Sequence, residues 1–88
     1  MWIRTQLGLT LVNADKIITI TAKSNHILAH LDGSNIDLGE YADASMSKRL
    51  LGIILILLGN ELVHQVDMPT KEEVTEEWLT KCEEVMKR

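Results

Sequence analysis

Three histidines, one cysteine and a group of carboxylates are the side chains of this 88-residue chain whose chemistry suits metal binding or catalysis. His26 and His30 lie four residues apart in a segment that alternates apolar and polar residues, which is typical of a β-strand. At about 3.3 Å per strand residue, their Cα atoms would be roughly 13 Å apart, too far for both to bind one metal ion unaided. No pair of histidine or cysteine residues has the spacing of a zinc site. We therefore expect the histidines to lie on a solvated strand face.

The carboxylates and the single cysteine also match no known site. Asp32, Asp37, Glu40 and Asp43 cluster near one end of the predicted strands, but their spacing differs from that of a calcium-binding loop. Turn formation and helix capping explain these residues without a ligand. Cys82 lies on the apolar side of a predicted helix, which favours a buried, unreactive thiol over a nucleophile. The chain also lacks a glycine-rich phosphate loop, a Gly-x-Ser-x-Gly motif and paired catalytic carboxylates, so we predict a protein that is not an enzyme and binds no cofactor or metal.

The charge balance argues against a nucleic-acid-binding protein. The chain has 9 basic and 13 acidic residues and a formal net charge of −4, whereas binding to phosphates depends on neutralisation by Lys and Arg. Lys48 and Arg49 form the one local basic spot. A nucleic-acid-associated accessory protein that uses this pair and the strand histidines is the alternative function.

The sequence favours a soluble cytoplasmic protein over a secreted or membrane-bound one. Residues 1–6 lack the charged and apolar regions of a signal peptide. The most apolar run, residues 50–59, is shorter than the roughly 20 residues that span a bilayer, and its extension would bring Glu61 and His64 into lipid. A buried core helix explains this run better than a membrane helix does. The single cysteine excludes an intramolecular disulfide bond and fits a reducing compartment.

The N-terminal half of the chain has the alternation and turn signals of an antiparallel β-meander. β-Branched residues alternate over residues 16–23, and the two-residue turn Ser24-Asn25 separates them from the strand of the histidines. Asp32-Gly33 is a strong hairpin signal, because glycine accepts the positive φ that such turns require. Trp2 is expected at the rim of the core rather than as a binding anchor. We predict three to four strands over residues 1–41, at residues 2–6, 16–23, 26–31 and 36–38, and Leu11-Val12 is a candidate for a further short extended piece.

The hydrophobic period changes after Tyr41, where we expect a helix over residues 43–65 that is capped by Asp43 or Ser45. Its apolar stripe suits one face of the sheet and consists of Met46, Leu50, Ile53, Ile54, Leu57, Leu58 and Leu62. The isoleucine-rich residues 52–57 are also compatible with a buried strand, but the length of the run favours the helix.

A second, acidic helix is predicted over residues 69–88. Pro69 interrupts the chain, and Thr70 with Glu73 forms a capping box. One face of this helix, expected to pack on the rest of the domain, carries Val74, Trp78, Cys82 and Val85. Residues 1–88 are thus predicted to form a single α+β domain, an antiparallel β-meander of three to four strands followed by two α-helices.

Small residues recur every seven positions on the side of the first helix that faces away from its apolar stripe. A glycine inside a helix costs about 1 kcal/mol relative to alanine, and close approach of another backbone can offset this cost. The predicted packing or interaction face consists of Ser45, Gly52, Ile56, Gly59 and Val63. Two interpretations are open: the C-terminal helix packs on this face within the chain, or a partner protein or second copy of the chain does.

Three short motifs in the first half of the chain carry a family resemblance. They are Met1-Trp2-Ile3-Arg4-x-Gln6, Leu11-Val12-Asn13-Ala14-Asp15-Lys16-Ile17 and Leu38-Gly39-x-Tyr41. Over roughly residues 1–50, the chain resembles small uncharacterised proteins of Gram-positive bacteria and their prophages. The resemblance implies a cytoplasmic bacterial or phage protein of unknown activity, and it assigns no catalytic or binding residue.

These features favour a small, non-catalytic protein-interaction module of the cytoplasm, with a prophage origin implied by the resemblance. Its expected partner is an unknown protein or a second copy of the chain in a homo-oligomer such as a homodimer. Neither nucleic acid nor a membrane is the expected partner.

Overall fold

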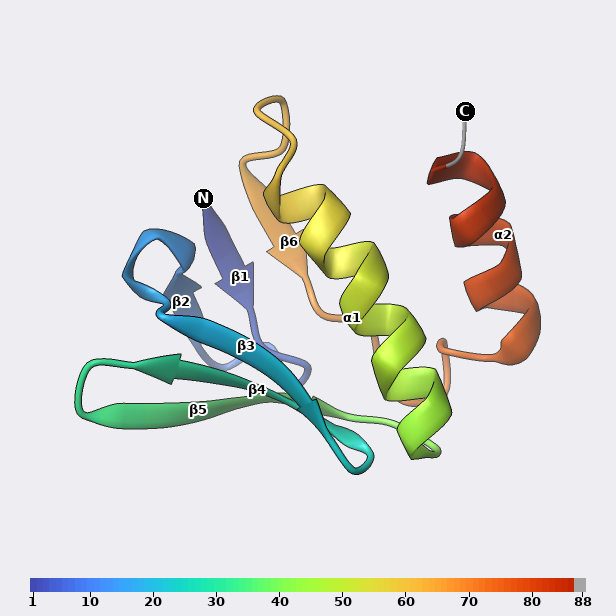
Figure 1. The fold of residues 1–88 in the computed structure, drawn as a ribbon, viewed down its shortest axis with the longest axis horizontal. Helices are drawn as coiled ribbons and strands as arrows, with labels where there is room; N and C mark the ends of the chain where they lie inside the picture. The colour runs from blue at the N-terminus through green and yellow to red at the C-terminus, as the bar shows by residue number, and fades with distance from the viewer. Residues whose placement is uncertain (87–88) are drawn as a thin grey trace.

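The computed structural model describes residues 1–86, which form a mixed α+β fold, as predicted. Within these residues, six strands make two three-stranded sheets, and two helices pack beside them (Figure 1). The elements in chain order are β1 (Trp2–Arg4), β2 (Leu11–Asn13), the short 3₁₀ helix η1 (Ala14–Lys16), β3 (Thr19–Lys23), β4 (His26–Leu31), β5 (Ser34–Glu40), α1 (Ala44–Leu58), β6 (Gln65–Asp67) and α2 (Glu76–Met86).

The strands β3, β4 and β5 form an antiparallel meander. The two-residue turn Ser24-Asn25 joins β3 to β4, and Asp32-Gly33 joins β4 to β5, so both predicted hairpin turns are confirmed. Gly33 has a φ of +79°, in the left-handed region that glycine adopts without strain. The strand β5 is longer than predicted, because its pairing with β4 continues past an irregularity in register at Ile27 and Leu28.

A second sheet, with the strand order β2–β1–β6, contains the first two strands. In this sheet β1 pairs antiparallel with β2, so that Ile3 lies opposite Val12. It pairs parallel with β6, so that Ile3 also lies beside Val66. The prediction of one meander over residues 1–41 is therefore wrong for these strands. Their third partner, β6, begins at the predicted end of the first helix and continues into the predicted break between the two helices, because a three-residue strand is too short to show alternation.

The helix α1 is shorter than its apolar stripe predicts. Asp43 is the cap, and its Oδ1 accepts a hydrogen bond from Met46 N at 2.8 Å. The helix ends before Gly59, after which Asn60 Oδ1 accepts a hydrogen bond from Leu62 N at 2.9 Å and turns the chain. The predicted end at residue 65 is therefore wrong, because Gly-Asn stops the helix. No helix within residues 1–86 has both the length and the apolar character needed to cross a membrane.

The helix α2 begins later than predicted. The capping box is present, since Thr70 Oγ1 accepts from Glu73 N and Glu73 Oε1 accepts from Thr70 N, both at 3.2 Å. It closes a single turn, and Thr75 Oγ1 then caps α2 by accepting a hydrogen bond from Trp78 N at 3.1 Å. The start predicted at residue 69 is wrong, because the capping box marks a helical turn but not how far the helix continues. The predicted end at residue 88 lies outside the described residues.

The later start of α2 also changes which of its residues face the core. Leu79 is fully buried, whereas Trp78 and Cys82 are half-buried beside it. Val85, predicted on the packing face, is 67% exposed. The prediction assumed one helix that includes Val74, but Val74 is buried in the segment before α2, so the spacing from it to Val85 does not define a helical face.

Mainly aliphatic side chains from both sheets and both helices form the core around α1. The helix contacts β3, β4, β6 and α2, and Figure 1 shows it between β6 and α2. The strand alternative for residues 52–57 is therefore wrong. The buried core residues are Ile3, Val12, Ile27, Ala29, Leu38, Tyr41, Leu50, Ile53, Ile54, Val66, Met68, Val74 and Leu79.

A set of hydrogen bonds around Tyr41, here called the Tyr41 junction, joins three distant segments. The buried Tyr41 hydroxyl donates to the Pro69 carbonyl oxygen at 2.9 Å. Gln6 Nε2 donates to the same oxygen at 3.3 Å and to the Glu40 carbonyl at 2.7 Å, while Gln6 Oε1 accepts from Glu40 N at 3.0 Å. The junction thus connects the chain after β1, the end of β5 and the chain after β6.

The Tyr41 hydroxyl is well suited to this role because it remains protonated. Burial raises the pKa of Tyr41 above its ordinary value, and the negative charges of Asp37 and Glu73 raise it further. The phenol therefore stays a hydrogen-bond donor to Pro69 throughout the pH range in which proteins usually function.

Substitutions at Tyr41 and Gly39 test the junction. Tyr41→Phe removes one bond to the Pro69 oxygen, which keeps its bond from Gln6, so the free energy of unfolding should fall by about 1 kcal/mol. A Cβ on Gly39 would lie 2.7 Å from the Tyr41 hydroxyl, so Gly39→Ala should cost about 1–3 kcal/mol through overpacking. Because Tyr41→Phe removes the closest clashing atom, the double variant should lose less than the sum of the two single losses. Urea unfolding measures all three variants, and strictly additive losses would contradict this contact.

Candidate functional site

The predicted face of the first helix is only partly present as one surface. Ser45, Gly52 and Ile56 lie on α1 and are exposed. Gly59 is the C-cap residue at the end of the helix and is also exposed. Val63 is half-buried in the loop that follows. It is separated from the other four residues because the helix stops at Leu58.

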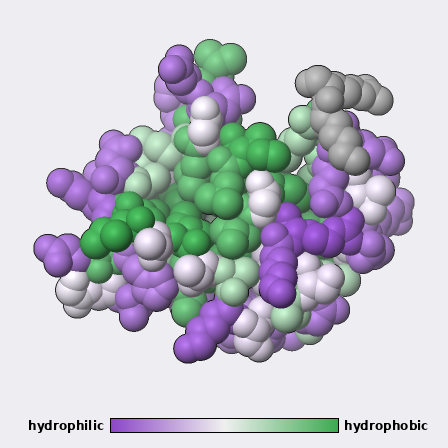
Figure 2. All heavy atoms as spheres, in the orientation of Figure 1, coloured by the Kyte–Doolittle hydropathy of each residue, from purple (hydrophilic) through white to green (hydrophobic). Residues whose placement is uncertain are grey.

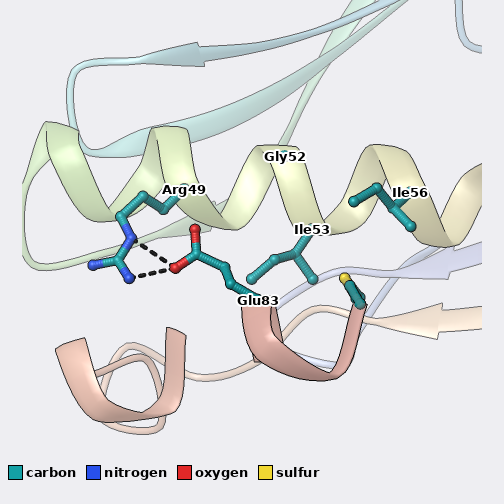
Figure 3. Close-up of a pocket in the computed structure, with 6 residues that line it drawn as sticks. Arg49, Gly52, Ile53, Ile56 and Glu83 are labelled. Atoms are coloured by element: carbon teal, nitrogen blue, oxygen red, sulfur yellow. Dashed lines mark hydrogen bonds and ion pairs between the residues drawn. The ribbon is translucent and has the colours of Figure 1, made fainter. Parts of the chain in front are cut away.

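Neither glycine is closely covered by another element of residues 1–86. A Cβ built on Gly52 would meet no atom within 4 Å, and one on Gly59 would meet only the carbonyl oxygens of Leu55 and Ile56, at 3.6 Å. The interpretation that the C-terminal helix packs closely on these glycines is therefore wrong. The physical reason is that α2 docks on the neighbouring side of α1, where the long side chain of Arg49 lies between the two helices (Figure 3).

A groove runs between α1 and α2 beside Gly52. It has a volume of about 250 Å³ and is lined by Arg49, Gly52, Ile53 and Ile56 of α1 and by Glu83 and Met86 of α2. Figure 3 shows Arg49 and Glu83 facing each other at one end, with Ile53 and Ile56 further along α1. Two residues of the predicted face, Gly52 and Ile56, thus border this groove. The groove is open at Gly52, because glycine has no side chain to fill it.

One arginine holds the two helices together. Arg49 Nη1 donates to Glu76, and Nη2 donates to Glu83 and, at 3.3 Å, to Thr80 Oγ1. Arg49 Nε also donates to Glu83, at 3.2 Å. Glu76, Thr80 and Glu83 follow at helical spacing on one face of α2, so a single guanidinium reaches all three. These four residues are called the Arg49 clamp below.

The clamp changes the interpretation of the basic spot. Hydrogen bonds to Glu83, and then to Glu76, raise the pKa of Arg49 above its ordinary value. Two carboxylates therefore compensate its charge within the chain. Lys48 alone remains as an exposed cation of the pair, and one lysine contributes little to phosphate binding.

The outer face of the meander carries the two strand histidines, as predicted. His26 Nδ1 lies 2.8 Å from Asp37 Oδ2, and His30 Nδ1 lies 2.6 Å from Asn35 Oδ1. His30 Nε2 lies 3.3 Å from Thr21 Oγ1, so hydroxyl, imidazole and acceptor stand in the order that nucleophilic catalysis uses. Both Thr21 and Asn35 are exposed on an open sheet face, where water is not excluded from a developing negative charge. The contacts among Thr21, His30 and Asn35 are better explained as side-chain pairing between neighbouring strands.

The acidic residues near the meander have structural partners. Asp43 caps α1, and Asp37 Oδ1 accepts a hydrogen bond from Gly39 N at 3.0 Å, which confirms capping and turn roles for these two. Glu40 lies 3.8 Å from Lys71 Nζ. Across residues 1–86, no three His, Cys, Asp or Glu side chains are grouped closely enough to hold a metal ion.

Trp2 lies on the surface and not at the rim of the core. Its side chain is 46% exposed on the outer face of the sheet β2–β1–β6, because Ile3 takes the inward position of β1. The predicted placement is therefore wrong. The sequence signal for an exposed Trp2 is the alternation of Trp2, Ile3 and Arg4, because successive strand residues point to opposite faces and only one of the two apolar residues can point inward.

The solvent-exposed side of α1 is more apolar than predicted from the sequence. Leu55 is 52% exposed and Ile56 is 57% exposed, on either side of Gly52. Figure 2 shows hydrophobic side chains gathered over the C-terminal half of the helix. Gly52, Leu55 and Ile56 are called the outer face of α1 below. The signal that identifies it is the run of apolar residues on every side of the helix, which in globular proteins is typical of a helix covered on all sides.

Comparison of the chain with protein-family models, with curated proteins and with solved structures found no match. The resemblance to small proteins of Gram-positive bacteria and their prophages stays a prediction from the three motifs. The structure places these motif residues in structural roles. Gln6, Gly39 and Tyr41 meet at the Tyr41 junction, and Asn13 Oδ1 accepts a hydrogen bond from Asp15 N at 3.0 Å at the start of η1.

The Arg49 clamp can be tested through the single cysteine of the chain. Arg49→Met removes the polar contacts that hold α2 to α1, so the half-buried Cys82 should react several-fold faster with a thiol reagent. Lys48→Met, on an adjacent exposed side chain, is the matched control and should leave the rate unchanged. Equal rates in the two variants would show that α2 does not depend on Arg49.

The open position of Gly52 predicts the sign of a stability change. Gly52→Ala adds a methyl group that meets no other atom, so in the single chain it should raise the free energy of unfolding by up to about 1 kcal/mol. Gly59→Ala, at the end of the helix, should have a smaller effect. Thermal melts at low and high protein concentration measure both. If Gly52→Ala lowers the melting temperature only at high concentration, a second chain covers this position.

Proposed function

We propose that this chain is a non-catalytic protein-interaction module of the cytoplasm that binds a protein partner, or a second copy of itself, through the outer face of α1. The observation that carries the proposal is the exposure of Leu55 and Ile56 around the uncovered Gly52. Contiguous apolar surface of this kind is typical of binding sites, whereas single exposed apolar residues are common everywhere.

The composition of α1 supports this surface as a binding site. A surface helix normally presents polar residues opposite its core stripe. On the exposed side of α1, Ser45 and Lys48 supply polar groups only in the first half of the helix. The second half exposes Leu55 and Ile56 in their place, so a partner helix or strand would bury apolar area there.

The groove beside the outer face adds a place for an anchor. Its volume of about 250 Å³ leaves room for one apolar side chain of a partner between Ile53, Ile56 and Met86. Binding energy in protein interfaces concentrates in such buried anchors, with the surrounding contacts excluding water.

The alternative function, a nucleic-acid-associated accessory protein, has less support. The basic spot retains only Lys48, because Arg49 is paired with Glu76 and Glu83. The net charge of −4 also opposes phosphate binding. No observation of the structure favours this function over protein binding.

The cellular setting is part of the proposal. A half-buried cysteine thiol that forms no disulfide suits the reducing cytoplasm. The three N-terminal motifs support an origin in Gram-positive bacteria or their prophages.

Introducing a negative charge on the outer face tests the function. Leu55→Glu and Ile56→Glu should abolish self-association in analytical ultracentrifugation or capture of a partner from a bacterial lysate, because a carboxylate would be desolvated in the interface. Leu9→Glu is the matched control, since Leu9 is 85% exposed on the β1–β2 loop and should tolerate the change. Binding that survives both helix variants, or that Leu9→Glu also abolishes, would reject the outer face as the site. A salt-dependent shift of DNA or RNA would support the alternative function instead.

A further inference from the structure

A larger cavity lies between α2, α1 and the chain around β6. Its volume is about 430 Å³, within the range of roughly 300–1,000 Å³ that is typical of small-molecule sites. The buried part of its lining is aliphatic and includes Leu50, Ile54 and Val66. Ile53 and Met86 line both this cavity and the groove beside Gly52.

The helix α2 forms one wall of the cavity. Leu79 is the fully buried contact of this helix, and the Arg49 clamp holds its polar side. Trp78 and Cys82 follow each other at helical spacing along the cavity and stay half-buried. The apolar side of α2 therefore borders the cavity without filling it.

The lining favours an aromatic guest over a purely aliphatic one. The lining includes the sulfur-containing residues Met68, Cys82 and Met86, and sulfur makes favourable contacts with aromatic rings. Methionine side chains also adapt their shape to a guest more easily than branched ones do. The indole of Trp78 offers a ring for stacked or edge-to-face packing.

The charges at the cavity disfavour an anionic guest. The charged residues of the described lining are the exposed Asp67 and Glu73, and no Lys, Arg or His among residues 1–86 lines the cavity. Arg4 lies 3.7 Å from Asp67 and compensates one of these two carboxylates. Within the described part of the chain, an anion would therefore lose its hydration without gaining a cationic partner.

We propose that this cavity binds a small, neutral aromatic molecule, with α2 as its outer wall. The site does not use the outer face of α1 and goes beyond the protein-binding function proposed above, although it shares Ile53 and Met86 with the groove of that function. Aliphatic side chains supply the apolar contact, the sulfur atoms and Trp78 favour a ring, and the carboxylates select against negative charge.

A fluorescence titration with the neutral dye N-phenylnaphthylamine tests the site in the intact chain. Saturable binding of one dye per chain is expected, and bound dye should slow alkylation of Cys82. Cys82→Phe places a ring in the cavity and should weaken the dye by roughly tenfold or more. Val85→Phe is the matched control, because Val85 is 67% exposed on α2 and does not line this cavity, and it should bind the dye as the unmodified chain does.

Three results would overturn the proposal. The first is the absence of saturable dye binding to the unmodified chain. The second is equal weakening by Cys82→Phe and Val85→Phe. The third is binding of the anionic dye anilinonaphthalene sulfonate as tightly as the neutral one. Protection of Cys82 from alkylation needs no variant, so the test remains decisive even where Cys82→Phe does not fold.

Discussion

The hydrogen bond from the buried Tyr41 hydroxyl to the Pro69 carbonyl joins parts of the chain that no local element could bring together. Gln6 shares the same acceptor from a position 63 residues away in the sequence. With these bonds in place, β1 is positioned against the end of β5, and the turn that leads into α2 starts at a defined point. Gly39 contributes by leaving room for the Tyr41 ring. This buried polar contact links the chain after β1, the end of β5 and the segment that leads into α2, and residues of two of the three sequence motifs meet at it.

The helix α1 packs in the core on several sides and also carries an exposed apolar face. It contacts both sheets and α2, and it therefore needs apolar residues on several sides. Because α2 covers only one flank, Leu55 and Ile56 stay exposed around Gly52. The Arg49 clamp lies on one side of the contact between α1 and α2, and the buried Leu79 anchors α2 in the core. The groove and the larger cavity are both lined by residues of α1 and α2, so both depend on how these helices meet.

Local signals in the sequence predicted the structure correctly where one or two residues determine the backbone conformation of a turn or a helix cap. Asp32-Gly33 and Ser24-Asn25 predicted the two hairpins, and Asp43 was one of two predicted caps of α1. The capping box at Thr70 also forms, although it closes a turn that α2 does not continue. The candidate site was predicted in part, since Gly52 and Ile56 do border a groove. Val63 does not join them, because α1 ends at Leu58 and Val63 lies in the loop that follows.

The sequence by itself determined the α+β class, the meander β3–β4–β5, the aliphatic core and the helical character of α1. These follow from periodicity and turn chemistry, which act over a few residues. Only the tertiary structure decided that β1 leaves the meander to pair with β6, because parallel pairing across some sixty residues depends on what lies beside each strand and not on any pattern within three residues. It also decided which side of α1 stays open. That choice depends on where α2 docks, which combines the burial of Leu79 with the fit of one guanidinium to Glu76, Thr80 and Glu83. The helical spacing of these three residues does not show which residue of α1 they meet.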